Sequence, residues 1–143
     1  MRFELKFPAY PDDSSWHSIL QMSTGTSRGR MGSRNPAVFY RRENGFRIIS
    51  YVNGNIDFTL NFKTNLPAAG KWILFEIRNL VVNGKLIYSI EIDGDMKFFV
   101  ENWTPAQLTN VTVHTSYPQT RISPIPNSEI RILEIKTRAF PVE

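Results

Sequence analysis

Two turn signals that stand one strand length apart constrain this chain more than any other feature. They are Asn83-Gly84 and Asp93-Gly94, in the segment 71–103, and each places side by side two residues that tolerate positive φ. A two-residue type I′ turn between antiparallel strands requires such a pair. Between the turns, apolar side chains occupy every second position, at Leu86, Tyr88, Ile90 and Ile92. The segment therefore predicts a three-stranded antiparallel meander.

Apolar stretches bounded by turn residues continue along the rest of the chain. Besides the three strands of the meander, we expect strands at 3–7, 16–23, 36–42, 46–52, 56–62, 111–117 and 129–137. Asn44-Gly45 and Asn53-Gly54 predict two further hairpins. Helical periodicity is not sustained anywhere in the sequence. About ten closely spaced strands are typical of an all-β, antiparallel sandwich or barrel, here as one domain over 1–143.

Two details of the pattern make sharper predictions. In the last expected strand the apolar face changes between Ile132 and Leu133, which indicates either a β-bulge or burial on both faces. Thr104 is a residue type that often caps a helix, and it is followed by Pro105. We therefore expect one helical turn over 104–110.

Composition argues against several classes of function. The 143 residues have the length of one domain and include no cysteine, which rules out disulfides and thiolate chemistry. With only His17 and His114 as histidines, a zinc site is not expected. No apolar run approaches the ~18 residues of a membrane span, and the start of the chain lacks a signal-peptide pattern. We therefore expect no membrane insertion, and either a cytoplasmic protein or a mature, excised domain.

Arginines are concentrated in one part of the chain. Six of them fall within residues 28–47, which hold a single acid, Glu43, so this segment carries more than the net charge of +4 of the whole chain. Part of the segment is the polar loop 24–35, and loops of that length often carry function. Arginine forks pair with carboxylate, sulfate or phosphate. The candidate ligand-binding residues are Arg28, Arg30, Arg34, Arg41 and Arg47, with a solvated loop and strand face as the alternative.

One group of acids resembles a catalytic motif. Glu91-Ile92-Asp93-Gly94-Asp95 resembles the Glu-x-Asp-x-Glu strand of laminarinase-like glycoside hydrolases, in which two carboxylates act on a sugar. Asp95 is shorter than the glutamate of that motif, and Asp93-Gly94 is better explained as a turn, so we expect no enzyme activity. Two acid pairs, Asp93 with Asp95 or Asp12 with Asp13, leave calcium open as a ligand, with solvated or capping acids as the alternative. No other cofactor is expected.

A few residues point to glycans without deciding the matter. Asn110 and Asn102 each begin an N-glycosylation tripeptide, which would matter in a secreted protein. The aromatic side chains that could stack on sugars, each also explained as part of a core or interface, are Tyr10, Trp16, Tyr40, Tyr51, Trp72 and Trp103. No recognisable nucleic-acid-binding module accompanies the basic segment, so nucleic acid is not expected as a partner.

Three stretches carry a resemblance to a known group of domains. They are TGTSRGRMGSRNPAVFYRRENGFRIISYVNGNIDF, LPAAGKWILFEIRNLVVNGKLIYSIEIDG and ENWTPAQLTNVTVHTSYP, and the matching pieces cover residues 3–138. The pattern resembles the concanavalin A-like, laminin G and pentraxin-type jelly rolls, in particular domains of extracellular invertebrate proteins. The most specific pieces are Gly32, Arg34, Pro36-Ala37-Val38-Phe39, Leu66-Pro67, Lys71-Trp72 and Glu101-Asn102. Ser33 departs from the pattern, which usually has aspartate there, so a cation or salt-bridge role of that acid is in question.

The resemblance implies a two-sheet antiparallel jelly roll that acts as a binding module, and not as an enzyme, in an extracellular or cell-surface protein. We expect lectin-like, reversible binding of an acidic glycan or an acidic protein surface by loops and one sheet face, first of all by the arginines of loop 24–35. The alternative is a structural or adhesive role, in which a sheet face or edge binds another chain or forms a homo-oligomer. A laminarinase-like hydrolase is the third interpretation.

Overall fold

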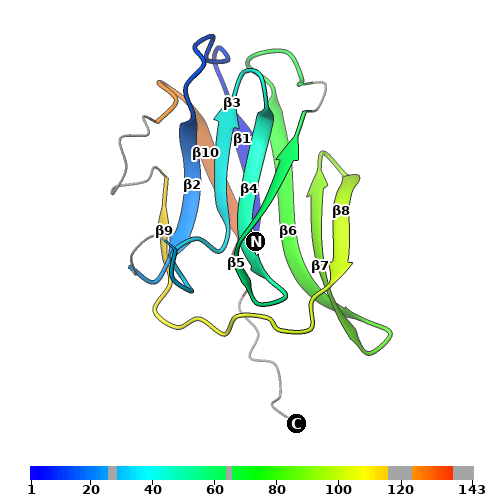
Figure 1. The fold of residues 1–143 in the computed structure, drawn as a ribbon. Coiled ribbons are helices and arrows are strands. Elements are labelled where there is room, and N and C mark those ends of the chain that lie inside the picture. The colour runs from blue at the N-terminus through cyan, green and yellow to red at the C-terminus, as the bar shows by residue number, and fades with distance from the viewer. Residues whose placement is uncertain (26–28, 64–65, 116–123, 137–143) are drawn as a thin grey trace.

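The structure is a computed structural model that describes residues 1–25, 29–63, 66–115 and 124–136, and within these it contains ten β-strands and no helix. The strands are β1 (Arg2–Lys6), β2 (His17–Ser23), β3 (Ala37–Arg41), β4 (Gly45–Val52), β5 (Asn55–Phe62), β6 (Trp72–Val82), β7 (Lys85–Ile92), β8 (Asp95–Glu101), β9 (Thr112–His114) and β10 (Glu129–Glu134). They form two antiparallel sheets of five strands that pack face to face (Figure 1). The expected all-β two-sheet sandwich is confirmed.

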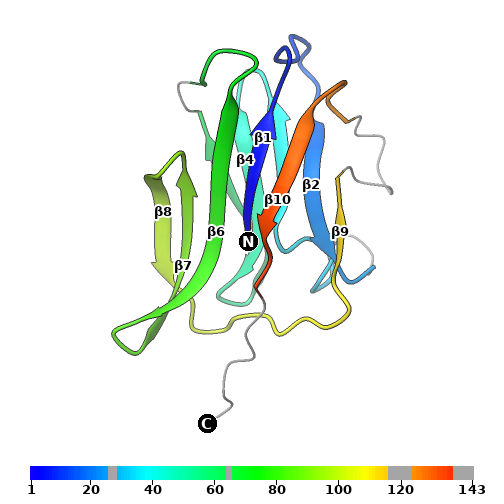
Figure 2. The ribbon, with the colours of Figure 1, turned by 180° about the vertical axis from the view of Figure 1, so that it is seen from behind.

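Hairpins build most of each sheet. The first sheet has the strand order β10-β1-β6-β7-β8 and the second sheet the order β5-β4-β3-β2-β9. In the first sheet β6, β7 and β8 form the expected meander, while β1 lies between β6 and β10, as Figure 2 shows from behind. In the second sheet β2 to β5 are consecutive, and β9 joins at the edge beside β2. The pairing of β1, β9 and β10 thus joins distant parts of the chain.

The expected hairpin turns have the backbone geometry that their residues favour. Asn53, Asn83 and Asp93 have φ values of 51°, 51° and 53°, and the glycine after each is also at positive φ. These are the two positive φ angles of a type I′ turn. The hairpin at Asn44-Gly45 is also present, but Gly45 is the first residue of β4 and pairs with Arg41. Its turn is therefore three residues long, with a glycine at positive φ after it.

The bulge expected in the last strand is confirmed. Arg2 pairs with Glu134 while Phe3 pairs with Ile132, so Leu133 is an extra residue in β10. Ile132 and Leu133 are both substantially exposed on this edge strand. The apolar face changes because of the bulge and not because both faces are buried.

The helical turn expected over 104–110 is wrong, because no helix forms there. This segment connects β8, at one edge of the first sheet, with β9, at the opposite edge of the second sheet (Figure 1). An extended chain rises ~3.3 Å per residue and a helix only ~1.5 Å, so the long crossing favours extended backbone. β9 is also shorter than expected, and residues 116–117 of that prediction lie outside the described residues.

The core lies between the sheets and is rich in aromatic rings. Phe3 stacks on Phe75, and Phe46 meets Phe75 edge to face, both with ring centroids 4.9 Å apart. All three side chains are fully buried. Burying one such ring contributes roughly 1.5–3 kcal/mol to the stability of the fold, so this cluster holds β1, β4 and β6 together. The two sheets therefore form a rigid support for whatever their outer faces present.

Candidate functional site

A small apolar cluster lies on the outer face of the second sheet, away from the main core. β3 and β4 alternate, so that Ala37, Phe39 and Ile49 face outward. Trp16, the residue before β2, packs against this cluster and is half-buried. The cluster therefore holds one face of the indole ring.

Two arginines stand over the indole of Trp16. The guanidinium carbon of Arg47, on β4, lies 3.8 Å from the ring centroid, and that of Arg41, at the end of β3, lies 5.8 Å away. The Nε of Arg47 donates a hydrogen bond of 2.9 Å to Oδ1 of Asn61, on the neighbouring strand β5. The stacking and this hydrogen bond together fix the plane of the Arg47 guanidinium. We call these three side chains, Trp16, Arg41 and Arg47, the Trp16 surface.

The positive charge of Arg47 has a hydrogen-bond acceptor, Asn61, but no ion-pair partner among the described residues. Burial, and next the charge of Arg41, lowers the pKa of Arg47 from its usual value, although an arginine stays protonated at neutral pH. Arg41 forms an ion pair with Glu43 at 2.8 Å, and Arg42 donates to the backbone oxygen of Asp12 at 3.0 Å. In the part of the chain that the structure describes, no carboxylate lies within ion-pair distance of Arg47. An external anion could therefore provide the missing partner.

The structure does not bring the five candidate arginines together. Arg41 and Arg47 belong to the Trp16 surface, whereas the loop between β2 and β3 lies at the other end of the sandwich (Figure 1). In that loop Arg30 is exposed, and Arg34 is 8% exposed with its Nη2 2.6 Å from Oδ1 of Asp57. Arg28 lies outside the described residues. The loop thus uses Arg34 within the fold, and ligand binding by Arg28 and Arg30 stays a prediction.

The first sheet carries a similar indole, and the two cations next to that ring each have an acid partner. Trp72 has the Arg131 guanidinium carbon 3.8 Å from its ring centroid and Lys6 Nζ 4.9 Å away. Lys6 forms an ion pair with Glu129, and Arg131 has Glu4 at 3.8 Å. The two surfaces share the same stacking but differ in charge balance. Trp72 therefore provides a natural comparison for the Trp16 surface.

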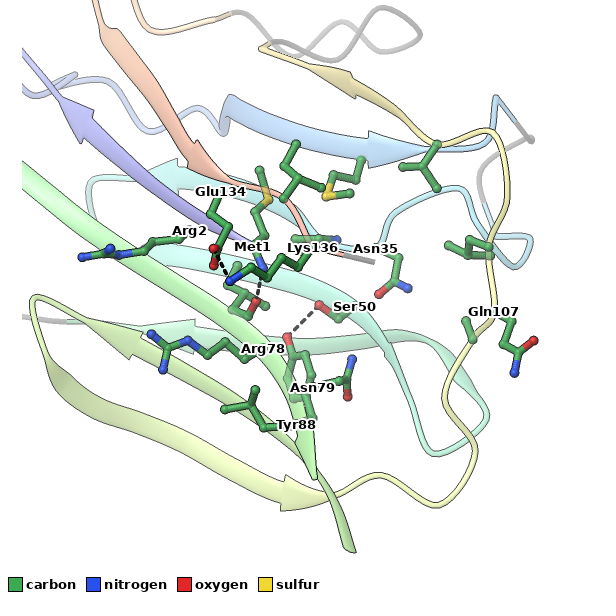
Figure 3. Close-up of a pocket in the computed structure, with 18 of the residues that line it drawn as sticks. Met1, Arg2, Asn35, Ser50, Arg78, Asn79, Tyr88, Gln107, Glu134 and Lys136 are labelled. Atoms are coloured by element: carbon green, nitrogen blue, oxygen red, sulfur yellow. Dashed lines mark hydrogen bonds and ion pairs between the residues drawn. The ribbon is translucent and has the colours of Figure 1, made fainter. Parts of the chain in front are cut away.

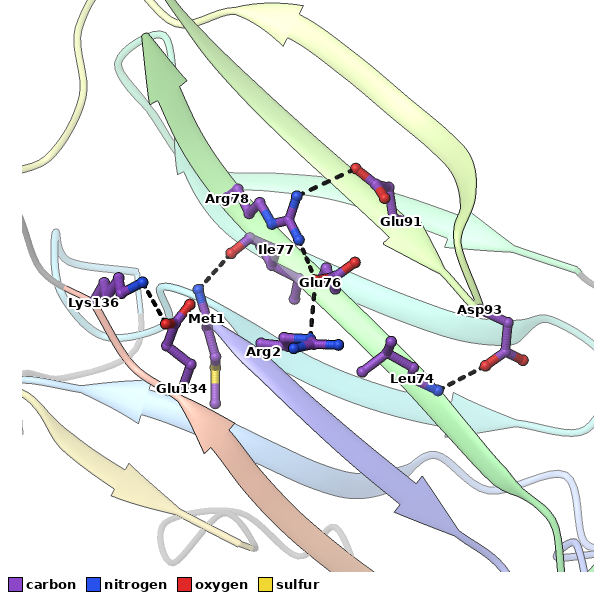
Figure 4. Close-up of polar contacts among 10 residues, drawn as sticks. All are labelled: Met1, Arg2, Leu74, Glu76, Ile77, Arg78, Glu91, Asp93, Glu134 and Lys136. Carbon is purple, nitrogen blue, oxygen red and sulfur yellow. Dashed lines mark hydrogen bonds and ion pairs between the residues drawn. The ribbon is translucent and has the colours of Figure 1, made fainter.

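Acids and bases alternate across the rest of the outer face of the first sheet. Glu76 receives ion pairs from Arg2, at 3.1 Å, and from Arg78, and Arg78 also lies 3.7 Å from Glu91 (Figure 4). This face is a network of paired charges. Such a face needs no external ligand to neutralise it.

The three acids that resemble a hydrolase motif each have a partner within the fold. Glu91 pairs with Arg78, and Asp93 lies in its turn, where its Oδ1 accepts a 2.8 Å hydrogen bond from the Leu74 amide (Figure 4). Asp95 pairs with Lys97 at 2.5 Å. The expected turn at Asp93-Gly94 is confirmed. Glu91 therefore lies on β7 and Asp95 on β8, one on each side of the turn.

In the other acid pair that could bind a cation, Asp13 already has hydrogen-bond partners. The backbone amide of Ser15 and next the ring of His17 lower the pKa of Asp13, and the His17 ring lies 3.0 Å from Asp13 Oδ1. Among the described residues, no group of three or more His, Asp or Glu side chains is arranged to hold a metal ion. Calcium as a ligand stays a prediction.

The two glycosylation candidates differ in accessibility. Asn102 is 1% exposed, its Nδ2 donates to Asn79 at 3.0 Å, and its Oδ1 accepts from the Asn53 amide at 2.9 Å. Asn110 is exposed. Only Asn110 could carry a glycan without loss of these hydrogen bonds, and modification of either residue stays a prediction.

Sequence reasoning found the arginines but not their arrangement. Trp16 stood among six aromatic residues with no feature that set it apart, and Asn61 was not singled out. Strand alternation would have placed Arg47 and Asn61 on the outward faces of β4 and β5, which are paired at this position. The contact of Arg47 with Trp16 requires knowledge of the sheet.

Comparisons of the chain with protein-family models, with curated proteins and with solved structures found no match. The resemblance to lectin-like and laminin G-type domains therefore rests on the sequence pattern, and the structure adds the two-sheet sandwich. Within the described residues, no helix is long and apolar enough to cross a membrane.

Proposed function

We propose that this chain is a non-catalytic recognition domain that binds the carboxylate or sulfate group of an acidic glycan at the Trp16 surface, in an extracellular or cell-surface protein. The observation that supports this proposal is the guanidinium of Arg47, which is fixed in place yet has no acid partner among the described residues. A preorganised guanidinium loses little freedom when it binds an anion, so more of the interaction energy appears as affinity.

The parts of the surface have separate roles in this proposal. Trp16 and Asn61 hold the Arg47 guanidinium, and Asn61 occupies its Nε. The two Nη groups of Arg47 then donate to the oxygens of the anion, since these are its remaining donors. Arg41 adds a second positive charge beside the site. In this mechanism the indole orients an arginine and does not itself stack on the sugar.

The first experiment is binding of the purified domain to a glycan array that includes sulfated and uronic-acid sugars, with and without calcium. It is run at two salt concentrations, one below and one above ~0.15 M, where charges are screened within roughly 8 Å. We expect acidic glycans to bind at the lower concentration and to weaken at the higher one, independently of calcium. Binding of neutral glycans only, or binding that requires calcium, would contradict the proposed site.

A second function is favoured by a different observation. The hairpin of β6 and β7 exposes Leu80, Val81 and Val82, which are 44%, 66% and 50% accessible. Exposed apolar residues that lie together mark interaction surfaces. An adhesive domain that binds another chain through this hairpin would bind almost independently of salt, because apolar contacts are not screened. The same array in both salts, followed by a test for self-association, separates the two functions.

A further inference from the structure

A pocket of about 630 Å³ opens between the two sheets (Figure 3). It lies at the end of the sandwich where β2 ends, whereas the Trp16 surface lies where β2 begins. Slightly more than half of its wall is apolar, and the wall comes from both sheets and from the segment that joins β8 to β9. The apolar lining includes Met22, Ile77, Leu80, Leu108 and Val111, and the polar lining includes Asn35, Asn79 and Gln107. Pockets for small molecules in proteins measure about 300–1,000 Å³ and are mostly apolar with a few polar groups. This pocket has the size of such a site, with an apolar part of the wall beside its polar groups.

A pair of hydroxyl groups joins the two sheets at this pocket. Ser50 Oγ, on β4, lies 2.7 Å from the hydroxyl of Tyr88, on β7 (Figure 3). Both residues are at most 2% exposed, and both line the pocket. Burial raises the pKa of the Tyr88 hydroxyl far above its usual value, so the proton stays on at neutral pH.

The hydroxyl pair has one more donor than it uses. Two hydroxyls carry two protons, and the hydrogen bond between them occupies one, whichever group donates. No other hydrogen bond of either hydroxyl is present within the described residues. A buried O–H without an acceptor is costly, so an acceptor atom that enters the pocket would gain a hydrogen bond here.

The charged side chains at the rim are already paired. Arg2 and Arg78 both pair with Glu76, and Lys136 pairs with Glu134 at 2.5 Å. The α-amino group of Met1, which also lines the pocket, donates to the backbone oxygen of Ile77 at 2.7 Å, and burial lowers its pKa from the usual value, which disfavours its charged form. An anionic molecule would find no unpaired cation among these groups, and burying its charge beside the apolar wall would be unfavourable. The rim therefore favours an uncharged molecule.

We propose that this pocket binds a neutral, largely apolar small molecule whose carbonyl or ether oxygen accepts the unused hydrogen bond of the Ser50–Tyr88 pair. The apolar body lies against the aliphatic wall, and the oxygen reaches the hydroxyls between the sheets. This site is separate from the anion site at the Trp16 surface and does not depend on it.

The test uses Prodan, a neutral naphthalene ketone whose emission moves to longer wavelength when its carbonyl accepts a hydrogen bond. We expect saturable binding with one site, and weaker binding of the anionic dye anilinonaphthalene sulfonate. In the double variant Ser50→Ala/Tyr88→Phe, Prodan should bind about five- to tenfold more weakly. Its bound emission should also move to shorter wavelength, because both donors are gone. Tyr40→Phe, which removes a buried hydroxyl that does not line the pocket, is the matched control and should change neither property.

A variant that fills the pocket keeps the test decisive if the double variant unfolds. Ala106 is half-buried and lines the pocket, so Ala106→Trp should abolish Prodan binding while it leaves the Ser50–Tyr88 pair intact. Absence of saturable Prodan binding, equal binding of both dyes, or binding that survives Ala106→Trp would overturn the proposal. Displacement of Prodan by apolar peptides but not by small ketones would identify a protein segment as the occupant and would also overturn it.

Discussion

Arg34 and Arg47 place the same side chain in two different environments, and the difference decides what each can do. Arg34 is 8% exposed and paired with Asp57 at 2.6 Å, so its guanidinium is used within the fold. Arg47 is half-buried on an indole and has no acid partner in the described part of the chain. The sequence singled out both as ligand-binding candidates, because the partner that distinguishes them lies on another strand.

The pairing of Arg34 leads to a prediction about stability. Asp57→Asn leaves a nearly buried guanidinium without its carboxylate and should lower the free energy of unfolding by about 2 kcal/mol. This is less than the ~3–5 kcal/mol for a fully buried pair, because the Asp57 side chain is 43% exposed. The control is Glu43→Gln, which breaks the more exposed pair with Arg41 and should cost less than ~1 kcal/mol. Urea unfolding measures both, and equal losses would contradict a special role of the Arg34 pair.

The half-buried Tyr10 leads to a prediction about stability in alkali. Burial, and next the charges of Tyr40 and Asp93, raises the pKa of Tyr10 to about 12 from 10. Between these values the unfolded chain loses the Tyr10 proton while the folded chain keeps it, so stability is complete below pH 10 and falls as the pH rises through 12. Tyr10→Phe should flatten this decline, measured as the free energy of unfolding at several pH values. A decline of unchanged steepness in Tyr10→Phe would show that other groups cause it.

At the scale of elements, the local turn chemistry was predictable and the connections between sheets were not. The turns at Asn53, Asn83 and Asp93 follow from two adjacent residues that accept positive φ. The segment 104–110 also had a local signal, for a helical turn, but it crosses from one sheet to the other and stays extended. A local preference worth less than ~1 kcal/mol per residue gives way to the position of the strands that it connects.

The hairpin of β3 and β4 leads to a prediction about its glycine. Gly45 has a φ of +71°, and a Cβ placed there would lie 2.1 Å from the backbone oxygen of Phe62. Gly45→Ala should therefore lower the free energy of unfolding by about 3 kcal/mol, from backbone strain and a clash that β5 cannot easily relieve. Gly84→Ala, at φ +76° with no atom within 4 Å, should cost only about 1–2 kcal/mol. Similar losses for the two variants in thermal unfolding would argue against the close approach of β4 and β5.

At the scale of the whole molecule, the sequence predicted the class of fold, and only the structure showed which strands and side chains lie next to each other. Alternating apolar residues and turn signals were sufficient to predict an all-β, antiparallel sandwich or barrel, and the resemblance to jelly-roll domains favoured the sandwich. The strand order was not predictable, because β1 pairs with β6 and β10 through contacts between distant parts of the chain. The Trp16 surface shows the same limit, since its residues come from β3, from β4 and from the position just before β2. A single sequence indicates which side chains of a strand face outward. It does not indicate which strands from distant parts of the chain pair with each other.

The most direct measurement of the central claim is the affinity of a sulfated or uronic-acid oligosaccharide, the best acidic hit of the array, for Arg47→Ala and Arg131→Ala by calorimetric titration. Both variants remove an arginine 3.8 Å from an indole, but only Arg47 lacks an acid partner in the described residues. Thermal unfolding checks that both variants are folded. We expect at least a tenfold loss of affinity in Arg47→Ala, as for one charged hydrogen bond, and little change in Arg131→Ala. Unchanged affinity in Arg47→Ala, or equal losses in both variants, would contradict binding at the Trp16 surface.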